Sequence, residues 1–317
     1  MNLLRVISGL KNRLAALILP AAHCRSKIIG VLVLATLLSA CSAVKIGYNQ
    51  LPTLAFFYLD GYADFTDTQS LQVKSELTRL QTWHRQTQLP AYADLLDKLQ
   101  IVLQGNITPA QVCAVWPDVR RQLLAVPSQA EPAIAALALS LQPEQLQHMQ
   151  RKFARGNADY RRDFIDATPA AIRAKRYEQA TSRADMLYGP LDEQQLRRIG
   201  QLVDQSGLNA PLVYAERLRR QQDALQTLRA ISAANTSVNT SANTAAVQTQ
   251  LRALLDRTLA SPEPAYRNYI DKNTLENCRA VAELHNSTTD VQRRKAIRVI
   301  RGYAVDFRTL ALVRATD

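Results

Sequence analysis

The stretch that decides the fold class is Thr66-Asp-Thr-Gln-Ser-Leu-Gln-Val-Lys-Ser-Glu-Leu-Thr-Arg-Leu-Gln-Thr-Trp-His84. It opens with a capping box, in which the hydroxyl of a threonine accepts the backbone N–H three residues ahead and the Gln69 side chain returns a bond. Apolar positions then recur at the period of a helix with one buried face, at Val73, Leu77, Leu80 and His84. The stretch therefore predicts an amphipathic α-helix.

Start signals of the same kind recur along the chain, at Ile107-Thr-Pro-Ala-Gln111, Leu141-Gln-Pro-Glu-Gln145, Leu191-Asp-Glu-Gln-Gln195 and Thr289-Asp-Val-Gln292. Their separations differ, so we interpret them as repeated capping and not as a repeat of fixed period. Proline is expected to interrupt helices, at Pro90 and again across Pro127 and Pro132. With no alternating strand pattern, the sequence predicts an all-α, bundle-like single domain of about ten helices without a significant β-sheet.

Composition divides the chain into three parts. The content of 47% hydrophobic and 21% charged residues is typical of a globular protein. We expect a single α-helical domain over residues 56–317, preceded by a tether over residues 41–55. Within the domain, residues 232–244 are rich in serine, asparagine and threonine, which predicts a flexible insert between helices.

The first 40 residues have the layout of a signal peptide. Arg25 and Lys27 precede eleven uncharged residues, Ile28 to Leu38, a run too short for a bilayer span of about 20 residues. Leu38-Ser-Ala-Cys41 resembles the bacterial lipobox. The resemblance implies cleavage before Cys41, a diacylglycerol thioether on its sulfur and an N-acyl chain such as palmitate, which together anchor the protein to a membrane. The alternative is an uncleaved signal anchor from Ile28 to Val44.

Net charge and sorting signals bear on the partners. The formal charge of +12 includes five basic residues before Cys41, and without them 34 basic side chains face 27 acidic ones. That surplus favours anionic neighbours such as lipid headgroups, while scattered basic residues and export argue against nucleic acid. Because Ser42, and not an aspartate, follows the cysteine, we expect the outer membrane in preference to the inner membrane.

Two cysteines, Cys113 and Cys278, remain once Cys24 is removed with the signal peptide and Cys41 is lipidated. Both lie among apolar residues of predicted helices. A pair of cysteines in an oxidising compartment predicts one disulfide, and closing so long a loop stabilises a protein by about 5 kcal/mol at most. The alternative is two separate buried thiols.

The sequence contains none of the common catalytic motifs, so we predict no catalytic residue, no metal site and no cofactor beyond the lipids. His84 is interpreted as a core histidine, and His148 one turn after Glu144 as too little for a metal ligand set. An interaction surface is predicted at Phe57, Tyr58, Arg151, Arg155 and Arg162. Alternatively, the aromatic residues tuck a first helix onto the core, and the arginines form a solvated, salt-bridged face.

Several phrases, taken in order, resemble an uncharacterised family of helical lipoproteins from Proteobacteria, a domain of unknown function. They are Leu59-Asp-Gly-Tyr62, Asp64-Phe65, Trp83-His-Arg-Gln-Thr-Gln-Leu-Pro90, Pro143-Glu-Gln-Leu146, Ser261-Pro-Glu-Pro-Ala-Tyr266, His285-Asn-Ser-Thr288 and Arg301-Gly-Tyr303. The resemblance implies a lipid site and an all-helical fold, but no catalytic activity. The segments at 107, 141 and 191 are also similar to the leucine-threonine-x-x-glutamine helix starts of small periplasmic chaperones.

Together these patterns predict a membrane-anchored envelope lipoprotein that faces the periplasm. We expect it to act as a non-enzymatic interaction or chaperone-like protein, by contact with a protein or another envelope component. The alternative hypothesis is a cell-envelope enzyme that acts on peptidoglycan or lipid. A deep pocket with clustered carboxylates or histidines would favour the enzyme, and a broad apolar face would favour binding.

The lipid anchor leads to the first testable prediction. Cells that express the wild-type chain in the presence of labelled fatty acid should incorporate the label into the protein, and the Cys41→Ala variant should not incorporate it. An inhibitor of the lipoprotein signal peptidase should block wild-type processing. Equal labelling of the two forms would contradict the prediction.

Overall fold

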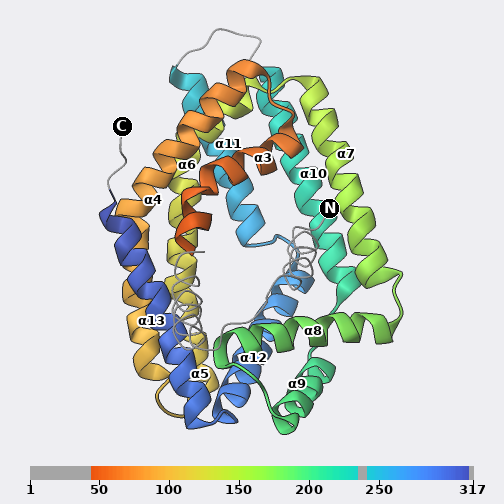
Figure 1. The fold of residues 1–317 in the computed structure, drawn as a ribbon. Helices are drawn as coiled ribbons and strands as arrows, with labels where there is room; N and C mark the ends of the chain where they lie inside the picture. The colour runs from red at the N-terminus through yellow and green to blue at the C-terminus, as the bar shows by residue number, and fades with distance from the viewer. Residues whose placement is uncertain (1–43, 235–240, 314–317) are drawn as a thin grey trace, which may run out of the picture. The chain divides into compact units, whose positions relative to one another are not determined.

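In the computed structural model, described over residues 44–234 and 241–313, every regular element is helical (Figure 1). The all-α prediction is confirmed, and residues Lys45–Asp317 form one compact unit. The elements of the described ranges are α3 Leu51–Ala63, α4 Asp67–Val102, α5 Pro109–Cys113, α6 Trp116–Ser140, α7 Pro143–Tyr160, the π-helix η1 Arg161–Ile165, α8 Pro169–Tyr188, α9 Glu193–Gln205, α10 Ala210–Ala234, α11 Ser241–Leu259, α12 Pro264–Asn286 and α13 Asp290–Leu312.

Helix starts follow the predicted capping signals. Thr66, Thr108, Asp192 and Thr289 each accept the backbone N–H of a glutamine three residues ahead, and that glutamine returns a bond to the backbone of the cap. These bonds satisfy donors that the first turn of a helix leaves without partners.

The predicted breaks at proline are wrong. Pro90 lies inside α4, and Pro127 and Pro132 lie inside α6. An interior proline removes one backbone hydrogen bond, at a cost of about 3 kcal/mol. Tertiary packing outweighs that cost, because Leu89 is buried next to Pro90 and Ala135 is buried three residues after Pro132.

Of the serine-, asparagine- and threonine-rich stretch, residues 232–234 end α10 and residues 241–244 begin α11. Residues 235–240 between them lie outside the described residues, as do the predicted signal peptide and Cys41. The flexible insert therefore stays a prediction for its central residues.

The longest helix, α4, lies alongside the last helix, α13 (Figure 1). Helix α13 also contacts α8, while α12 contacts α5, α9 and α10. Helix α6 packs on α4, α10 and α11, and α3 packs on α4 and α7. The buried apolar residues form separate small clusters, centred on Ile300, Ile231 and Ile199.

A polar contact joins the first turns of α4 and α7 through Gln69 and Gln145, both buried. Each side-chain amide donates to the oxygen of the other, with N···O distances of 3.3 and 2.8 Å. Gln69 also donates to the backbone oxygen of Ser140, and Gln145 donates to that of Asp64, both at 2.9 Å. Since each amide oxygen also caps its own helix, all four hydrogen-bonding positions of both amides are filled.

An equivalent pair, Gln195 and Gln292, joins the first turns of α9 and α13. The reciprocal bonds measure 2.8 and 2.9 Å, and the second amide hydrogens go to the backbone oxygens of Ser287 and Pro190. In both pairs, each glutamine donates to the carbonyl two residues before the N-cap of the partner helix. The same local chemistry thus orients two helix pairs, and we call Gln69–Gln145 and Gln195–Gln292 the glutamine pairs.

Candidate functional site

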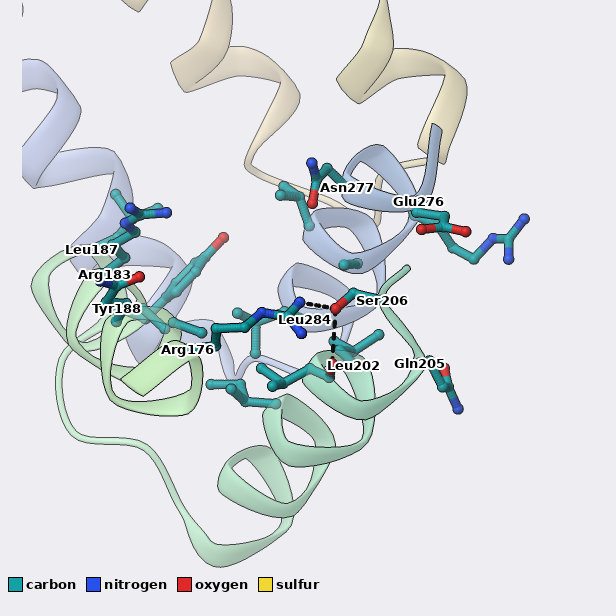
Figure 2. A pocket seen from close by; sticks show the side chains of 18 residues that line it. Arg176, Arg183, Leu187, Tyr188, Leu202, Gln205, Ser206, Glu276, Asn277 and Leu284 are labelled. Atoms are coloured by element: carbon teal, nitrogen blue, oxygen red, sulfur yellow. Dashed lines mark hydrogen bonds between the residues drawn. The ribbon is translucent and has the colours of Figure 1, made fainter. Parts of the chain in front are cut away.

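A cavity of about 460 Å³ opens between α8, α9 and α12 (Figure 2). Its apolar wall is supplied by side chains from all three helices, namely Ala184, Leu187, Ile199, Leu202, Val203 and Leu284. Helix α9 forms part of this wall, and the Gln195–Gln292 pair holds its first turn against that of α13.

The polar residues around this cavity carry a surplus of positive charge. Arg176, Arg183 and Arg279 line it together with a single carboxylate, Glu276. Glu276 accepts the backbone N–H of Gly207 at 3.2 Å. Arg176 donates to the Ser206 hydroxyl, as Figure 2 shows. An apolar wall with a basic rim suits a ligand that is apolar in part and negatively charged at its edge.

A second cavity, of about 450 Å³, lies on another side of α12, between it and helices α4, α5 and α6. It is lined mostly by aliphatic side chains and by Trp116, which is exposed. Asn277 and Val281 of α12 line both cavities. Helix α12 therefore separates two neighbouring hollows that each present apolar surface to solvent.

The disulfide predicted from the cysteine count lies in the wall of the second cavity. Cys113 of α5 and Cys278 of α12 are joined, with a sulfur–sulfur distance of 2.05 Å and 5.6 Å between their Cα atoms. The bond links residues 165 positions apart in the chain. It holds the short helix α5 against α12, which is the helix that both cavities share.

His285 fixes the same region from inside. It is fully buried, its Nε2 donates to the backbone oxygen of Gly105 at 2.9 Å, and its Nδ1 accepts from the Tyr188 hydroxyl at 3.0 Å. Burial raises the pKa of Tyr188 to about 12, so this hydroxyl stays protonated. The neighbouring Asn286 exchanges two bonds with the backbone of Ile107, at 2.8 and 2.9 Å. These bonds hold the segment before α5 in place.

The other histidines also contact structural partners. His84 is partly buried among Tyr48, Trp83 and Tyr92, and its Nδ1 lies 3.0 Å from the Tyr48 hydroxyl. His148 Nε2 lies 3.3 Å from the backbone oxygen of Gly61. Among the described residues no group of three or more histidine, cysteine, aspartate or glutamate side chains could hold a metal ion.

The predicted interaction surface is spread over three elements. Phe57 and Tyr58 are exposed on α3, and Arg151 and Arg155 are exposed on α7, which packs on α3. Arg162 lies in η1 and pairs with Asp159 and Asp163, at 2.7 and 3.0 Å. The helices that carry the two aromatic residues and the first two arginines are therefore neighbours. Arg162 instead forms salt bridges at the surface, as the alternative interpretation predicts.

A buried charge cluster was missed by the sequence analysis. Glu216 of α10 is almost fully buried and binds Arg219, Arg220 and the Ser261 hydroxyl, at 2.6 to 2.9 Å. Burial alone would raise the pKa of Glu216, but these hydrogen bonds outweigh it and lower the pKa to about 2. The spacing of Glu216, Arg219 and Arg220 at i, i+3 and i+4 was visible in the sequence. The contact of Glu216 with the distant Ser261 was not.

One stretch of the described residues, Pro109–Ser140, is long and apolar enough to cross a membrane by length and composition, with a mean hydropathy of 1.3. It contains α5 and α6, and α6 packs against α4, α10 and α11. Length and composition alone are weak evidence for a span, since a packed helix can pass the same test.

Fold and cavities together define an all-α protein with an apolar hollow on each side of α12, both open to solvent. The chain belongs to the Family of unknown function (DUF6279), whose model matches residues 61–267. No curated protein and no solved structure gives a significant match. The membership agrees with the predicted resemblance to an uncharacterised family, and it assigns no activity.

The phrases that carried the resemblance make structural contacts. Asp60 of Leu59-Asp-Gly-Tyr62 accepts the backbone N–H of Phe65 at 2.9 Å, and Ser261 binds Glu216. His285-Asn-Ser-Thr288 binds Gly105, Ile107 and, through the backbone oxygen of Ser287, Gln195. These phrases therefore contain residues that bind other helices and loops of the fold.

The buried histidine leads to a prediction on pH dependence. Burial lowers the pKa of His285 below its ordinary value of 6.5, although the bond to Gly105 opposes the shift. As the pH falls below 6.5, the unfolded chain takes up a proton that the folded chain resists, so the free energy of unfolding should fall. His285→Gln cannot titrate at this position and should show a shallower dependence between pH 7 and pH 5 in urea unfolding, even though it is less stable. An unchanged slope would contradict the prediction.

Proposed function

We propose that this protein is a lipid-anchored envelope protein that works without catalysis, by binding an apolar segment of a partner protein against α12. The observation that carries the proposal is the pair of apolar hollows on the two sides of that helix. Both hollows have the volume of ligand-binding pockets and are lined in large part by apolar side chains, as such pockets commonly are.

The shape and charge of the two hollows support a protein segment as the ligand. Val281 and Asn277 lie between the hollows, so a bound segment that crosses α12 could place one apolar side chain in each. Arg183 and Arg279 on the first rim would then attract acidic residues that flank the apolar ones. A binding mode of this kind agrees with the chaperone-like hypothesis drawn from the glutamine-containing helix starts.

Three features support a location on the periplasmic face of the envelope, and Ser42 after the cysteine favours the outer membrane. The first is the signal-peptide layout of residues 1–40, and the second is the lipobox-like sequence that ends at Cys41. The third is the disulfide between Cys113 and Cys278, because such bonds persist in oxidising compartments. The partners proposed are the membrane, through the acyl chains on Cys41, and a protein of the same compartment.

The alternative, an enzyme that acts on peptidoglycan or lipid, needs a polar side chain essential for its reaction. The contacts of the described histidines are mainly structural, because His84, His148 and His285 each lie against a tyrosine hydroxyl or a backbone oxygen. His148 also lies near a carboxylate, with 3.8 Å between its Nδ1 and the exposed Asp64. Complete loss of function from the substitution of one such residue, in a stably folded protein, would favour the enzyme.

Photo-crosslinking in cells tests the binding site. A photoreactive amino acid at Val281, which lines both hollows, should give adducts with one or a few envelope proteins. The matched control is Val305 of α13, which is 53% exposed against 49% for Val281 and lies outside the lining of both hollows. Equal yields at the two positions, or no protein adduct at position 281, would contradict the proposed site.

A further inference from the structure

Helix α3 presents a row of apolar side chains to solvent. Leu51, Leu54, Phe57 and Tyr58 are all exposed, and their spacing places them along one side of the helix. The buried residues of α3, Phe56 and Ala63, belong to a different face. Phe56 packs against Phe65 and lies beneath the ammonium group of Lys74. The interior of the protein therefore accounts for one side of α3. The apolar row stays exposed, although within the same helix Phe57 contacts the ring of Phe56 and Tyr58 contacts that of Tyr62.

The position of this row in the chain limits what can cover it. Lys45, the first residue of the compact unit, is four residues after Cys41, so an extended chain between them spans at most about 14 Å. Lys45 is held in place, because its ammonium group lies 3.2 Å from the buried carboxylate of Asp306. Residues 44–49 are already helical and lead into α3. A membrane anchor on Cys41 would thus bring α3 close to the membrane surface.

The charges near α3 suit a lipid surface. Lys45 is the one charged residue between positions 44 and 59, so the exposed row contains no acid. The nearest acids are Asp60, which accepts the backbone N–H of Phe65, and the exposed Asp64 after the end of the helix. Cations flank the helix from its neighbours: Lys74 of α4 lies 4.4 Å from the Phe56 ring centre, and Lys152 of α7 lies 5.5 Å from that of Tyr62. Aromatic side chains favour the boundary between headgroups and acyl chains, and lysines beside them favour anionic headgroups.

We propose that α3 is a second membrane contact, which lies along the lipid–water interface and inserts Leu54, Phe57 and Tyr58 among the headgroups. This inference rests on the proposed anchor at Cys41. A single attachment point alone would leave the domain free to rotate relative to the membrane. Together, the acyl chains and α3 hold the domain in one orientation on the membrane. The occupant of the apolar row is thus the bilayer that carries the anchor.

Fluorescence in reconstituted vesicles tests the contact. The full lipidated protein is placed in vesicles of phosphatidylethanolamine and phosphatidylglycerol, with one environment-sensitive fluorophore on a new cysteine and the native disulfide kept oxidised. Phe57→Cys is compared with Met186→Cys on α8, since the native side chains are 65% and 66% exposed. The label at position 57 should shift to shorter wavelength and be quenched by nitroxide-labelled lipid, and the label at position 186 should show neither effect.

Vesicle flotation and circular dichroism of both labelled proteins separate the outcomes. If the protein floats with the vesicles and the label at position 57 is quenched no more than that at position 186, the membrane contact of α3 is overturned and the lipid anchor stands. If the wild-type protein does not float, the anchor itself is wrong and the contact that rests on it falls as well. Matched spectra of the two variants show that neither result comes from unfolding.

Discussion

Two reciprocal pairs of glutamine amides, of which Gln69, Gln145 and Gln195 are buried and Gln292 is half-buried, fix how the helices of this protein meet. A buried side-chain amide that loses its partner costs about 1 to 3 kcal/mol, so an amide at such a joint stabilises the arrangement only when all of its positions are filled. Gln69 and Gln145 fill them, because each caps its own helix, bonds to the other amide, and binds a backbone oxygen before the partner helix. The arrangement specifies both the start of two helices and the way they meet.

The second glutamine pair holds helices that line the candidate site. Gln195 and Gln292 join α9 to α13, and Gln195 also holds the backbone oxygen of Ser287 at the end of α12. The first turn of α9, one wall of the first cavity, is therefore tied to the end of the helix that both cavities share. The disulfide, Asn286 and His285 attach the other side of α12 to residues 105–113. These polar contacts and the disulfide hold the helices that line both hollows.

Helix class and helix starts could be predicted from the sequence, since capping boxes and the apolar period are local signals. The disulfide could also be predicted, because removal of the signal peptide and lipidation of Cys41 would leave Cys113 and Cys278 as the two remaining thiols. Which capping boxes pair with each other could not be predicted, because Gln111 has the same local signal as Gln145 but caps only its own helix. Pro90 was misinterpreted because the continuation of α4 depends on tertiary packing, such as the burial of Leu89, that a local pattern does not show. The cavities were missed because their walls combine residues from Arg176 to Leu284 that no local pattern connects.

A double-mutant cycle on Gln69 and Gln145 measures the central contact most directly, with the free energy of unfolding determined in urea for the wild type, Gln69→Leu, Gln145→Leu and the double variant. Each single substitution leaves the other amide buried with an unfilled position, whereas the double substitution removes both amides. The two single losses should therefore sum to more than the loss in the double variant, with a coupling energy of about 1 to 3 kcal/mol. Losses that add to within about 0.5 kcal/mol would show that the two amides act independently and would contradict the proposed role of the pair.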